Sequence, residues 1–273
     1  MRLAGVMGWP VAHSKSPVIH RFWLSVLGLD GDYVRLPVRP EDLGQALRSL
    51  PALGFAGVNL TVPHKVAALA HVDMADPRAR AVGAANLVRV EEGRLVAGNS
   101  DVDGVLAALA RLGVGRGAVV ALLGSGGAAR AALAALAALD VMEVRLLARN
   151  RAAAAALLTG FALPGRVAGL DAAADAMAGA VLVNATSLGM AGAEPMPAAL
   201  LDAAGRAAGV FDMVYAPLET ALLARARAAG IPAVDGLVML VGQARAGFAA
   251  FYGVEPPGGR DDALRALLLG DGT

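Results

Sequence analysis

Polar residues lie at or after the ends of two apolar segments in the first part of the chain, 3–8 and 56–60. They are Ser14, Ser16, Asn59, Thr61 and Lys65. Ligands of α/β sheets gather at the carboxyl ends of strands, so these side chains would share one site. A site rich in hydroxyl and amide groups suits a small ligand with several hydroxyls and a carboxylate, because each buried ligand hydroxyl needs a hydrogen-bond partner.

Lys65 and Asp101 are the charged pair that could transfer protons at such a site. When hydride reduces a carbonyl, negative charge develops on the carbonyl oxygen, and a lysine ammonium can both stabilise it and donate a proton. A nearby carboxylate would orient the ammonium and join a proton relay. Spacing alone favours a structural role over a catalytic one. In that interpretation, Lys65 is a surface lysine after a helix-starting proline and Asp101 is a helix cap.

A glycine-rich turn separates a strand-like from a helix-like segment in the middle of the chain. Residues 119–123 are apolar, Gly124-Ser125-Gly126-Gly127 follows, and 128–139 is a strong helix former. A second apolar segment, 144–147, comes at the distance that a crossover to a parallel strand needs. The glycines permit a tight turn, and the helix N-terminus offers N–H groups to a pyrophosphate. The pattern favours a dinucleotide site over a purely structural turn.

The residues after the second apolar segment indicate which dinucleotide binds. NAD sites usually have an acid about 20 residues after the glycines that bonds the ribose 2′-hydroxyl. This chain instead has Ala148-Arg149-Asn150-Arg151, with no acid. Arg149 and Arg151 would bind a 2′-phosphate through bidentate, charge-assisted hydrogen bonds. We therefore favour NADP over NAD; the alternative is that both arginines are ordinary solvated charges.

Composition limits the class of protein. With 57% hydrophobic but only 4% aromatic residues, the core should be aliphatic, and a net charge of +1 predicts neither nucleic-acid nor membrane-surface binding. The longest uncharged stretch, 176–193, contains polar residues and is no membrane span. The N-terminus lacks a signal-peptide pattern, so we expect a cytoplasmic protein. There is no cysteine, and the histidines lack metal-binding spacing, so we expect no metal.

Strand and helix patterns alternate along the chain, which predicts an α/β fold. The expected strands are 3–8, 33–38, 56–60, one ending near 90, 95–97, 119–123, 144–147, 166–169, 181–184, 210–214 and 232–234. The expected helices are 17–27 with Ser16 as its cap, 40–50, 105–112 capped by acids of 99–103, 128–139, 151–158, 236–252 and one from 261 or 262 to about 269.

Eight motifs in sequence order, from Gly8 to Gly253, resemble those of shikimate dehydrogenases. They are Gly8-x-Pro10 with His13-Ser14-Lys15-Ser16-Pro17, Asn59-x-Thr61-x-Pro63-x-Lys65, Gly83-Ala84-x-Asn86, Asn99-Ser100-Asp101, Gly124-x-Gly126-Gly127-Ala128, Asn184-Ala185-Thr186-Ser187-x-Gly189-Met190, Asp212-x-Val214-Tyr215-x-Pro217, and Gly236-Leu237-x-Met239-Leu240 with Gln243-Ala244. Each motif alone is weak, but the ordered set is highly specific.

The resemblance implies reversible, NADPH-dependent reduction of 3-dehydroshikimate to shikimate, in chorismate and aromatic amino-acid biosynthesis. It implies an N-terminal α/β substrate-binding domain, 1–103, rejoined by helices of 237–273, and a Rossmann-type NADP-binding domain, 104–236. The catalytic pair would be Lys65 and Asp101. The residues implied to bind substrate are Ser14 and Ser16 at the carboxylate, with Asn59, Thr61, Lys65, Asn86, Asp101, Tyr215 and Gln243 around the ring hydroxyls. Those implied to bind NADP(H) are Gly124, Ser125, Gly126, Gly127, Ala128, Arg149, Asn150, Arg151, Asn184, Thr186, Ser187, Met190, Gly236 and Met239.

Several positions depart from the family pattern. Near the substrate, Arg21 stands for Asn, Leu87 for Thr and Ser100 for Thr; Ser100 keeps the hydroxyl, Leu87 loses one, and Arg21 adds bulk and charge. At the adenosine end, Ala148-Arg149-Asn150 replaces the usual Asn-Arg-Thr, so the principal arginine stays.

Two other functions compete with this interpretation. One is a quinate/shikimate dehydrogenase that prefers NAD, which the missing acid argues against, as does Ser16, where quinate-using relatives tend to carry Thr. The other is an NADPH-binding sensor without turnover, which would have lost Lys65 and Asp101, yet both are present. The expected partner is a small-molecule substrate, and we expect the protein to be a monomer or a homodimer.

Overall fold

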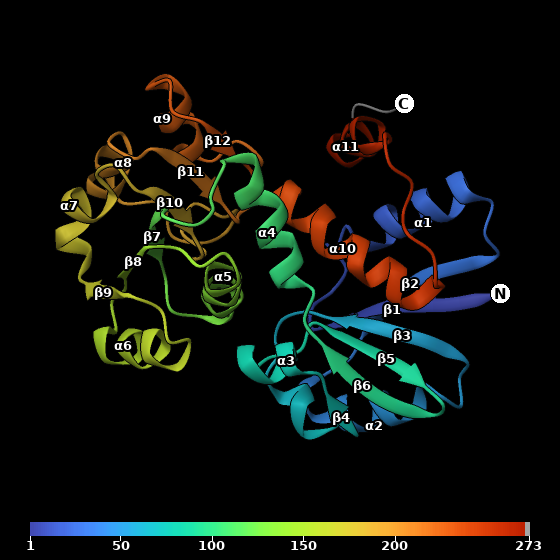
Figure 1. Ribbon diagram of the computed structural model, residues 1–273. Helices are drawn as coiled ribbons and strands as arrows, with labels where there is room; N and C mark the ends of the chain where they lie inside the picture. The colour runs from blue at the N-terminus through green and yellow to red at the C-terminus, as the bar shows by residue number, and fades with distance from the viewer. Residues whose placement is uncertain (271–273) are drawn as a thin grey trace. The chain divides into compact units, whose positions relative to one another are not determined.

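The computed structural model describes residues 1–270, which divide into two compact units (Figure 1). The first contains Met1–Ser100 and the chain from Gln243 onward, and the second is Asp101–Gly242. The sequence analysis predicts the domain boundaries between residues 103 and 104 and between residues 236 and 237. The last three residues of the expected segment 237–273 lie outside the described residues. Among residues 1–270, no helix is long and apolar enough to cross a membrane.

The first unit contains a six-stranded mixed sheet in the order β2-β1-β3-β5-β6-β4. Its strands are β1 (Arg2–Gly8), β2 (Gly31–Pro37), β3 (Phe55–Leu60), β4 (Met74–Ala75), β5 (Leu87–Glu91) and β6 (Arg94–Gly98). β1 pairs in parallel with β2 and β3, whereas β5 is antiparallel to β3 and β6. The parallel part places the ends of β1 and β3 side by side, which is where the predicted polar residues follow.

Helices from both ends of the chain complete this unit. They are α1 (Ser16–Leu27), η1 (Pro40–Asp42), α2 (Leu43–Ser49), η2 (Ala67–Ala70), α3 (Pro77–Val82), the later part of α10 (Gly236–Tyr252) and α11 (Asp261–Leu269). The sequence analysis missed β4, which is only two residues long, and α3. The signal for α3 was present, because Asp76 caps it by accepting from the Ala79 N–H and Pro77 is its first residue.

An aromatic cluster occupies one part of this unit's core. Its rings are His20 and Trp23 of α1, Tyr33 of β2, and Phe248, Phe251 and Tyr252 of α10. The expectation of a purely aliphatic core is wrong here, because the few aromatic residues of the chain concentrate in one place. A second cluster, which includes Leu43, Leu47 and Val58, is aliphatic except for Phe55.

The second unit contains an all-parallel sheet in the order β12-β11-β10-β7-β8-β9. Its strands are β7 (Val119–Leu123), β8 (Glu143–Leu147), β9 (Gly165–Ala168), β10 (Val181–Asn184), β11 (Gly209–Asp212) and β12 (Ala233–Val234). This is the strand order of dinucleotide-binding sheets, whose ligands lie where the order reverses, here between β7 and β10. The predicted fold class is confirmed.

The helices of this unit include three that the sequence analysis missed, α7, α8 and α9. The set is α4 (Asp101–Arg111), α5 (Gly127–Ala138), α6 (Arg151–Gly160), η3 (Leu170–Ala172), α7 (Ala173–Met177), α8 (Ala198–Ala204), α9 (Ala221–Ala228) and the start of α10. The expected start of α4 at 105 is wrong, because the helix begins at Asp101. Asp101 and Asp103 therefore lie in its first turn, where negatively charged carboxylates interact favourably with the positive end of the helix dipole.

Candidate active site and nucleotide pocket

The loop after β1 carries Ser14, and Ser16 follows as the first residue of α1, whose N-cap is Lys15. Arg35 of β2 donates from Nε and Nη2 to the Ser14 carbonyl at 3.2 and 2.7 Å, and Lys15 donates to the Leu268 carbonyl of α11 at 2.5 Å. The Ser16 N–H donates to the Ser14 hydroxyl oxygen at 3.4 Å. Two cationic side chains thus hold this loop, and the two serines lie two residues apart where the loop enters α1.

The end of β3 adjoins the end of β1 because the two strands are parallel, with Val6 opposite Asn59. The Thr61 N–H donates to the Met7 carbonyl at 2.9 Å, which continues the ladder past the strand. Gly8 makes this close approach possible, because a Cβ at that position would lie 2.4 Å from the Thr61 side chain. The structure therefore brings Asn59 and Thr61, at the end of β3, beside the end of β1.

Asn86 connects this strand end to the segment after β6. Its carbonyl accepts from Asn59 Nδ2 at 3.1 Å and from the Leu60 N–H at 2.8 Å. Its side-chain oxygen accepts from the Ser100 N–H at 2.7 Å, and its Nδ2 donates to the Ser100 hydroxyl at 3.1 Å. Asn59, Asn86 and Ser100 are all buried. Serine at 100 supplies the hydroxyl that this network uses, so the departure from Thr is accommodated.

The two residues predicted to be catalytic lie in different units. Lys65 belongs to the first unit, where it is half-buried and its carbonyl accepts from the Ala85 N–H at 2.7 Å, directly before Asn86. Asp101 follows Ser100 in the sequence and begins α4 of the second unit, where its side chain is buried. Neither residue fully matches a purely structural role as a surface lysine or a helix cap. Lys65 is half-buried, and Asp101 is already the first residue of the helix.

The two remaining substrate-site predictions also lie on separate units. Gln243 is buried on α10 and is the first residue of the C-terminal part of the first unit. Tyr215 belongs to the second unit, where it follows β11 and is half-buried. Burial raises the pKa of the Tyr215 phenol, so its hydroxyl stays protonated and can donate a hydrogen bond near neutral pH.

The structure shows where the two residues that depart from the family pattern, Arg21 and Leu87, lie. Arg21 lies on the exposed side of α1, and its Nε contacts Asp32 Oδ1 at 2.7 Å. That hydrogen bond raises the pKa of Arg21 and lowers the pKa of Asp32. Leu87 is buried in the sheet, opposite Asn59 on one side and Gly98 on the other. Arg21 therefore adds its bulk and charge at the surface of the unit.

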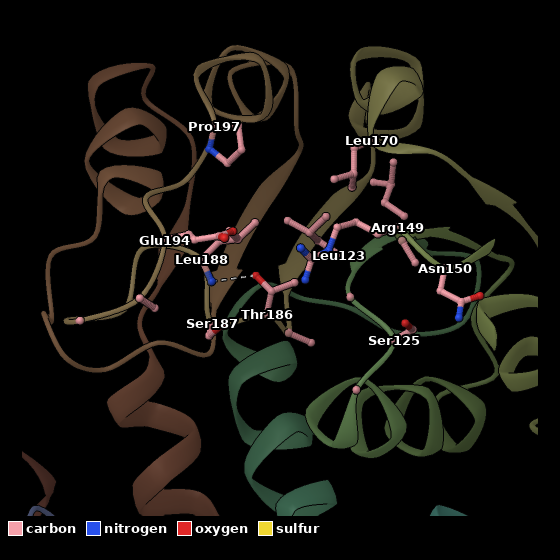
Figure 2. A pocket seen from close by; sticks show the side chains of 17 residues that line it. Leu123, Ser125, Arg149, Asn150, Leu170, Thr186, Ser187, Leu188, Glu194 and Pro197 are labelled. Carbon is pink, nitrogen blue, oxygen red and sulfur yellow. Dashed lines mark hydrogen bonds between the residues drawn. The ribbon is translucent and has the colours of Figure 1, made fainter. Parts of the chain in front are cut away.

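A cavity of about 890 Å³ lies at the carboxyl ends of the strands of the second unit (Figure 2). Segments after β7, β8, β9 and β10 contribute to it. Its lining residues are Leu123, Gly124, Ser125, Gly126, Leu147, Ala148, Arg149, Asn150, Leu170, Ala185, Thr186, Ser187, Leu188, Gly192, Ala193, Glu194 and Pro197. The volume is within the range of small-molecule and cofactor sites.

The glycine turn at the start of this cavity fits a pyrophosphate. Gly124 has a φ of +112°, which side-chain-bearing residues rarely adopt, and a Cβ there would lie 2.9 Å from the Thr186 side chain. α5 begins at Gly127, and Gly126 offers no side chain to cap it. The first N–H groups of α5 are therefore not used by a side-chain cap, as anion binding at a helix N-terminus requires.

Arg149 and Glu194 are the two charged residues that line the cavity. Figure 2 shows their side chains reaching into it from opposite sides. Asn150 lines the cavity too, but its side chain caps α6 by accepting from the Ala153 N–H at 3.0 Å. Arg151 does not line it, and its guanidinium contacts Asp171 at 3.2 Å. Of the two predicted arginines, the structure brings only Arg149 to this cavity.

Asn184 holds the loop after β10 through side-chain hydrogen bonds. It is fully buried, its Nδ2 donates to Asp212 at 2.9 Å, and its oxygen accepts from the Thr186 hydroxyl at 2.7 Å. The same Thr186 oxygen accepts from the Leu188 N–H at 3.1 Å, as Figure 2 shows. Burial raises the pKa of Asp212, opposed by hydrogen bonds that include one from Thr220. Asn184 therefore shapes the loop, whereas Thr186 and Ser187 line the cavity.

The other predicted cofactor residues lie outside the cavity lining. Gly127 and Ala128 form the first turn of α5, Met190 is exposed after β10, and Met239 is half-buried on α10. Gly236 begins α10 where a Cβ would lie 2.4 Å from the Met213 carbonyl, so close backbone packing requires glycine there.

The sequence analysis missed several lining residues. Leu123 and Leu147 end predicted strands, so strand-end logic could have found them, and Leu170 follows another strand. Glu194 lies in a long loop, where no pattern in the sequence indicates which side chain turns into the cavity.

Comparisons with known proteins agree with this geometry. Residues 6–88 match the family model described as the shikimate dehydrogenase substrate binding domain. The chain is 50% identical to the shikimate dehydrogenase (NADP(+)) of Rhodospirillum rubrum over 98% of this chain and 97% of that protein, and 46% identical to that of Paramagnetospirillum magneticum over 98% of each. The crystal structure of shikimate 5-dehydrogenase from Thermus thermophilus in complex with NADP(H) and shikimate matches with a TM-score of 0.85 and 38% identity, over 97% of this chain and 99% of that one. A chain with this degree of identity over its whole length belongs to the shikimate dehydrogenase family.

Proposed function

We propose that this protein catalyses the reversible, NADPH-dependent reduction of 3-dehydroshikimate to shikimate in the shikimate pathway. The observation that carries the proposal is the buried hydrogen-bond network of Asn59, Asn86 and Ser100, which adjoins the Ser14–Ser16 loop and the backbone of Lys65. Such a set of hydroxyl and amide groups suits a polyhydroxylated carboxylic acid. Family membership supports the same reaction, because the relatives named above are NADP-dependent shikimate dehydrogenases.

We assign the substrate contacts by chemical type. The hydroxyls of Ser14 and Ser16 would donate to the carboxylate, with Lys15 and Arg35 placing two positive charges on the same loop. The ring hydroxyls would be bound by the remaining polar side chains, which are Asn59, Thr61, Lys65, Asn86, Asp101, Tyr215 and Gln243.

The residues around the second unit's cavity fit NADP(H). The turn at Gly124–Gly126 and the start of α5 suit the pyrophosphate. The Arg149 guanidinium suits the 2′-phosphate, because no acid follows β8, where an NAD site would carry one to bond the free 2′-hydroxyl. Thr186 and Ser187 add hydroxyls to the opposite wall. Asn184, Gly236 and the first turn of α5 would act on the shape of this site rather than line it.

Lys65 and Asp101 would perform the proton transfer. NADPH, when bound, supplies the hydride that reduces the substrate carbonyl. Lys65 would donate a proton to the carbonyl oxygen as negative charge develops there, and in the oxidative direction it would accept the proton of the same hydroxyl. Asp101 would orient the ammonium toward the carbonyl oxygen.

Initial rates that cross shikimate and quinate with NADP and NAD test the proposal. We expect shikimate with NADP to have the highest kcat/KM by a wide margin. Comparable values with quinate or NAD would instead identify a broader quinate/shikimate dehydrogenase. Tight NADPH binding without turnover of either substrate would identify a sensor protein and overturn the enzymatic assignment.

Substitution of Lys65 tests the catalytic role directly. Lys65→Ala should lower kcat by about a hundredfold or more with a modest change in the KM for shikimate, because the group acts in the transition state. Lys65→Arg keeps the positive charge but hardly releases a proton near neutral pH, so it should also lose most of kcat. An unchanged kcat in either variant would exclude Lys65 as the proton donor.

A further inference from the structure

Tyr33 is buried beneath the proposed substrate site and lies in none of the motifs that identify the family. It belongs to β2, its side chain is 0% exposed, and its ring stacks on His20 with centroids 3.9 Å apart. Its hydroxyl donates to Asn59 Oδ1 at 2.7 Å. The Ser16 side chain also lies within hydrogen-bonding reach of the Tyr33 hydroxyl. Tyr33 thus contacts one proposed carboxylate ligand and one proposed ring-hydroxyl ligand without being accessible itself.

The hydrogen bonds around Asn59 determine which way its amide faces. The Asn86 carbonyl can only accept, so the Asn59 NH₂ group must face it. The Asn59 oxygen then faces Tyr33, which must donate. Burial raises the pKa of Tyr33 well above its usual value, so the phenol keeps this proton near neutral pH. The second N–H of Asn59 is thereby left to meet a ligand oxygen.

We propose that Tyr33 is a positioning residue of the shikimate site, whose buried hydroxyl fixes the Asn59 amide so that it presents an N–H donor to the substrate. The inference rests on the proposed function, because it takes Asn59 as a substrate ligand. It assigns Asn59 the role of donor, so the substrate hydroxyl that it meets must accept. Without the Tyr33 hydroxyl, the Asn59 oxygen would be a buried acceptor lacking its partner, and the amide would lose its fixed orientation.

The chain provides a matched control for Tyr33. Tyr252 belongs to the same aromatic cluster, and its hydroxyl donates to the Asp32 carbonyl at 2.9 Å, away from Ser16 and Asn59. Tyr33→Phe and Tyr252→Phe therefore each remove one hydroxyl and one hydrogen bond from the same core. Only the first changes a proposed substrate ligand.

The test compares steady-state kinetics and shikimate binding by calorimetry in four proteins. These four are the wild type, Tyr33→Phe, Tyr252→Phe and the double variant Tyr33→Phe with Asn59→Ala, and a fifth protein, Asn59→Ala alone, is the reference for the double variant. Tyr33→Phe should raise the KM and Kd for shikimate about tenfold, with kcat and the KM for NADP within about twofold of the wild type. Tyr252→Phe should leave all four constants within about twofold. In the Asn59→Ala background, removing the Tyr33 hydroxyl should have little further effect, because it has no amide left to position.

Different results separate the two proposals. If the wild type neither binds nor oxidises shikimate, the proposed function fails. If the wild type is active but Tyr33→Phe and Tyr252→Phe behave alike, Tyr33 is only part of the core and the positioning role is overturned. Independent, additive effects of Tyr33→Phe and Asn59→Ala would overturn it as well, and this comparison holds even where Tyr33→Phe lowers the stability of the fold.

Discussion

Arg149 is the residue whose proposed contact with the 2′-phosphate would determine the choice between NADP and NAD. It is the cation that lines the cavity of the second unit, whereas Arg151 contacts Asp171 outside it. Arg149→Leu should raise the KM for NADP by about tenfold or more and leave the KM for NAD nearly unchanged, because only NADP carries the 2′-phosphate. Steady-state kinetics with both cofactors measure this.

Arg151→Leu is the matched control for that prediction. Its guanidinium is exposed and paired with an exposed carboxylate, so removing it should change the KM for NADP less than about twofold. Equal effects of the two substitutions would mean that both arginines bind the phosphate, as the spacing in the sequence alone allows.

At the scale of residues, the sequence offered candidates for the chemistry but not the residues that support them. Asn59 and Asn86 stand in recognisable motifs at strand ends, and the structure joins them by a hydrogen bond. Tyr33 stands in an ordinary strand, and its role depends on a contact across the sheet that residue spacing does not encode. Glu194 is similar, because the direction of a side chain in a long loop depends on the packing of the whole loop.

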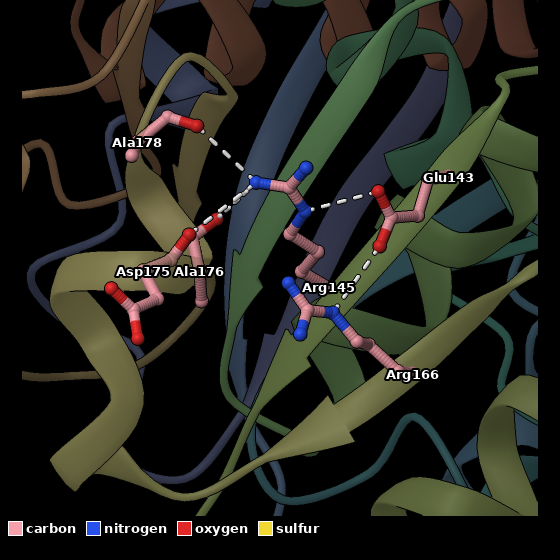
Figure 3. Close-up of polar contacts among 6 residues, drawn as sticks. All are labelled: Glu143, Arg145, Arg166, Asp175, Ala176 and Ala178. Carbon is pink, nitrogen blue, oxygen red and sulfur yellow. Dashed lines mark hydrogen bonds and ion pairs between the residues drawn. The ribbon is translucent and has the colours of Figure 1, made fainter.

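Among the elements, the short helix α7 depends on a side chain from the neighbouring sheet. Arg145 of β8 donates through Nη1 to the carbonyls of Asp175, Ala176 and Ala178, at 3.5, 3.3 and 3.2 Å (Figure 3). The last carbonyls of a helix have no partner within it, and a cation there also opposes the negative end of the dipole. Leu170, a residue of the cavity wall, lies shortly before this helix.

We predict that Arg145→Met lowers the free energy of unfolding by about 2 kcal/mol, because several carbonyls lose their donor. Arg166 is the matched control, since it lies opposite Arg145 in the sheet and shares Glu143 with it. Its side chain is 59% exposed, so Arg166→Met should cost less than about 0.5 kcal/mol. Urea unfolding of both variants tests this, and an equal loss would show that the ion pairs with Glu143, rather than the carbonyl contacts, stabilise this region.

The sequence predicted helices and strands well where the hydrophobic periodicity was strong. The prediction failed for short elements. The central strands β7, β10 and β11 of the parallel sheet were predicted closely, because they are largely buried on both faces and mostly apolar. The helices α7 and α8 were missed because they have five and seven residues, too few to show a clear period. The start of α4 was misplaced because Asp101 resembles a cap while its backbone is already helical.

The molecule as a whole depends on segments from both ends of the chain. His20 and Trp23 near the N-terminus pack against Phe248 and Tyr252 near the C-terminus, so the first unit is completed only when the end of the chain is present. Composition predicted an aliphatic core because it counts residues without locating them. The return of the C-terminal helices was implied by the family resemblance and not by residue patterns.

The pH dependence of stability follows from His20 at the centre of this cluster. Its side chain is 0% exposed, and neither ring nitrogen forms a hydrogen bond within residues 1–270. Burial lowers the pKa of His20 from 6.5 to about 3. The unfolded chain therefore takes up a proton below pH 6.5 that the folded chain refuses, so this contribution to stability is complete above pH 6.5 and is lost as the pH falls toward about 3.

Replacing His20 by Phe should remove this pH dependence while keeping an aromatic ring in the cluster. Between pH 6.5 and about pH 5, the free energy of unfolding of the wild type should fall more steeply than that of His20→Phe, by up to about 1.4 kcal/mol per pH unit. Urea unfolding at several pH values measures both slopes, and His13→Gln at an exposed position controls for the loss of a histidine. Parallel slopes for the wild type and His20→Phe would mean that the folded protein accepts the proton on His20, which requires the aromatic cluster to open to water at mildly acidic pH.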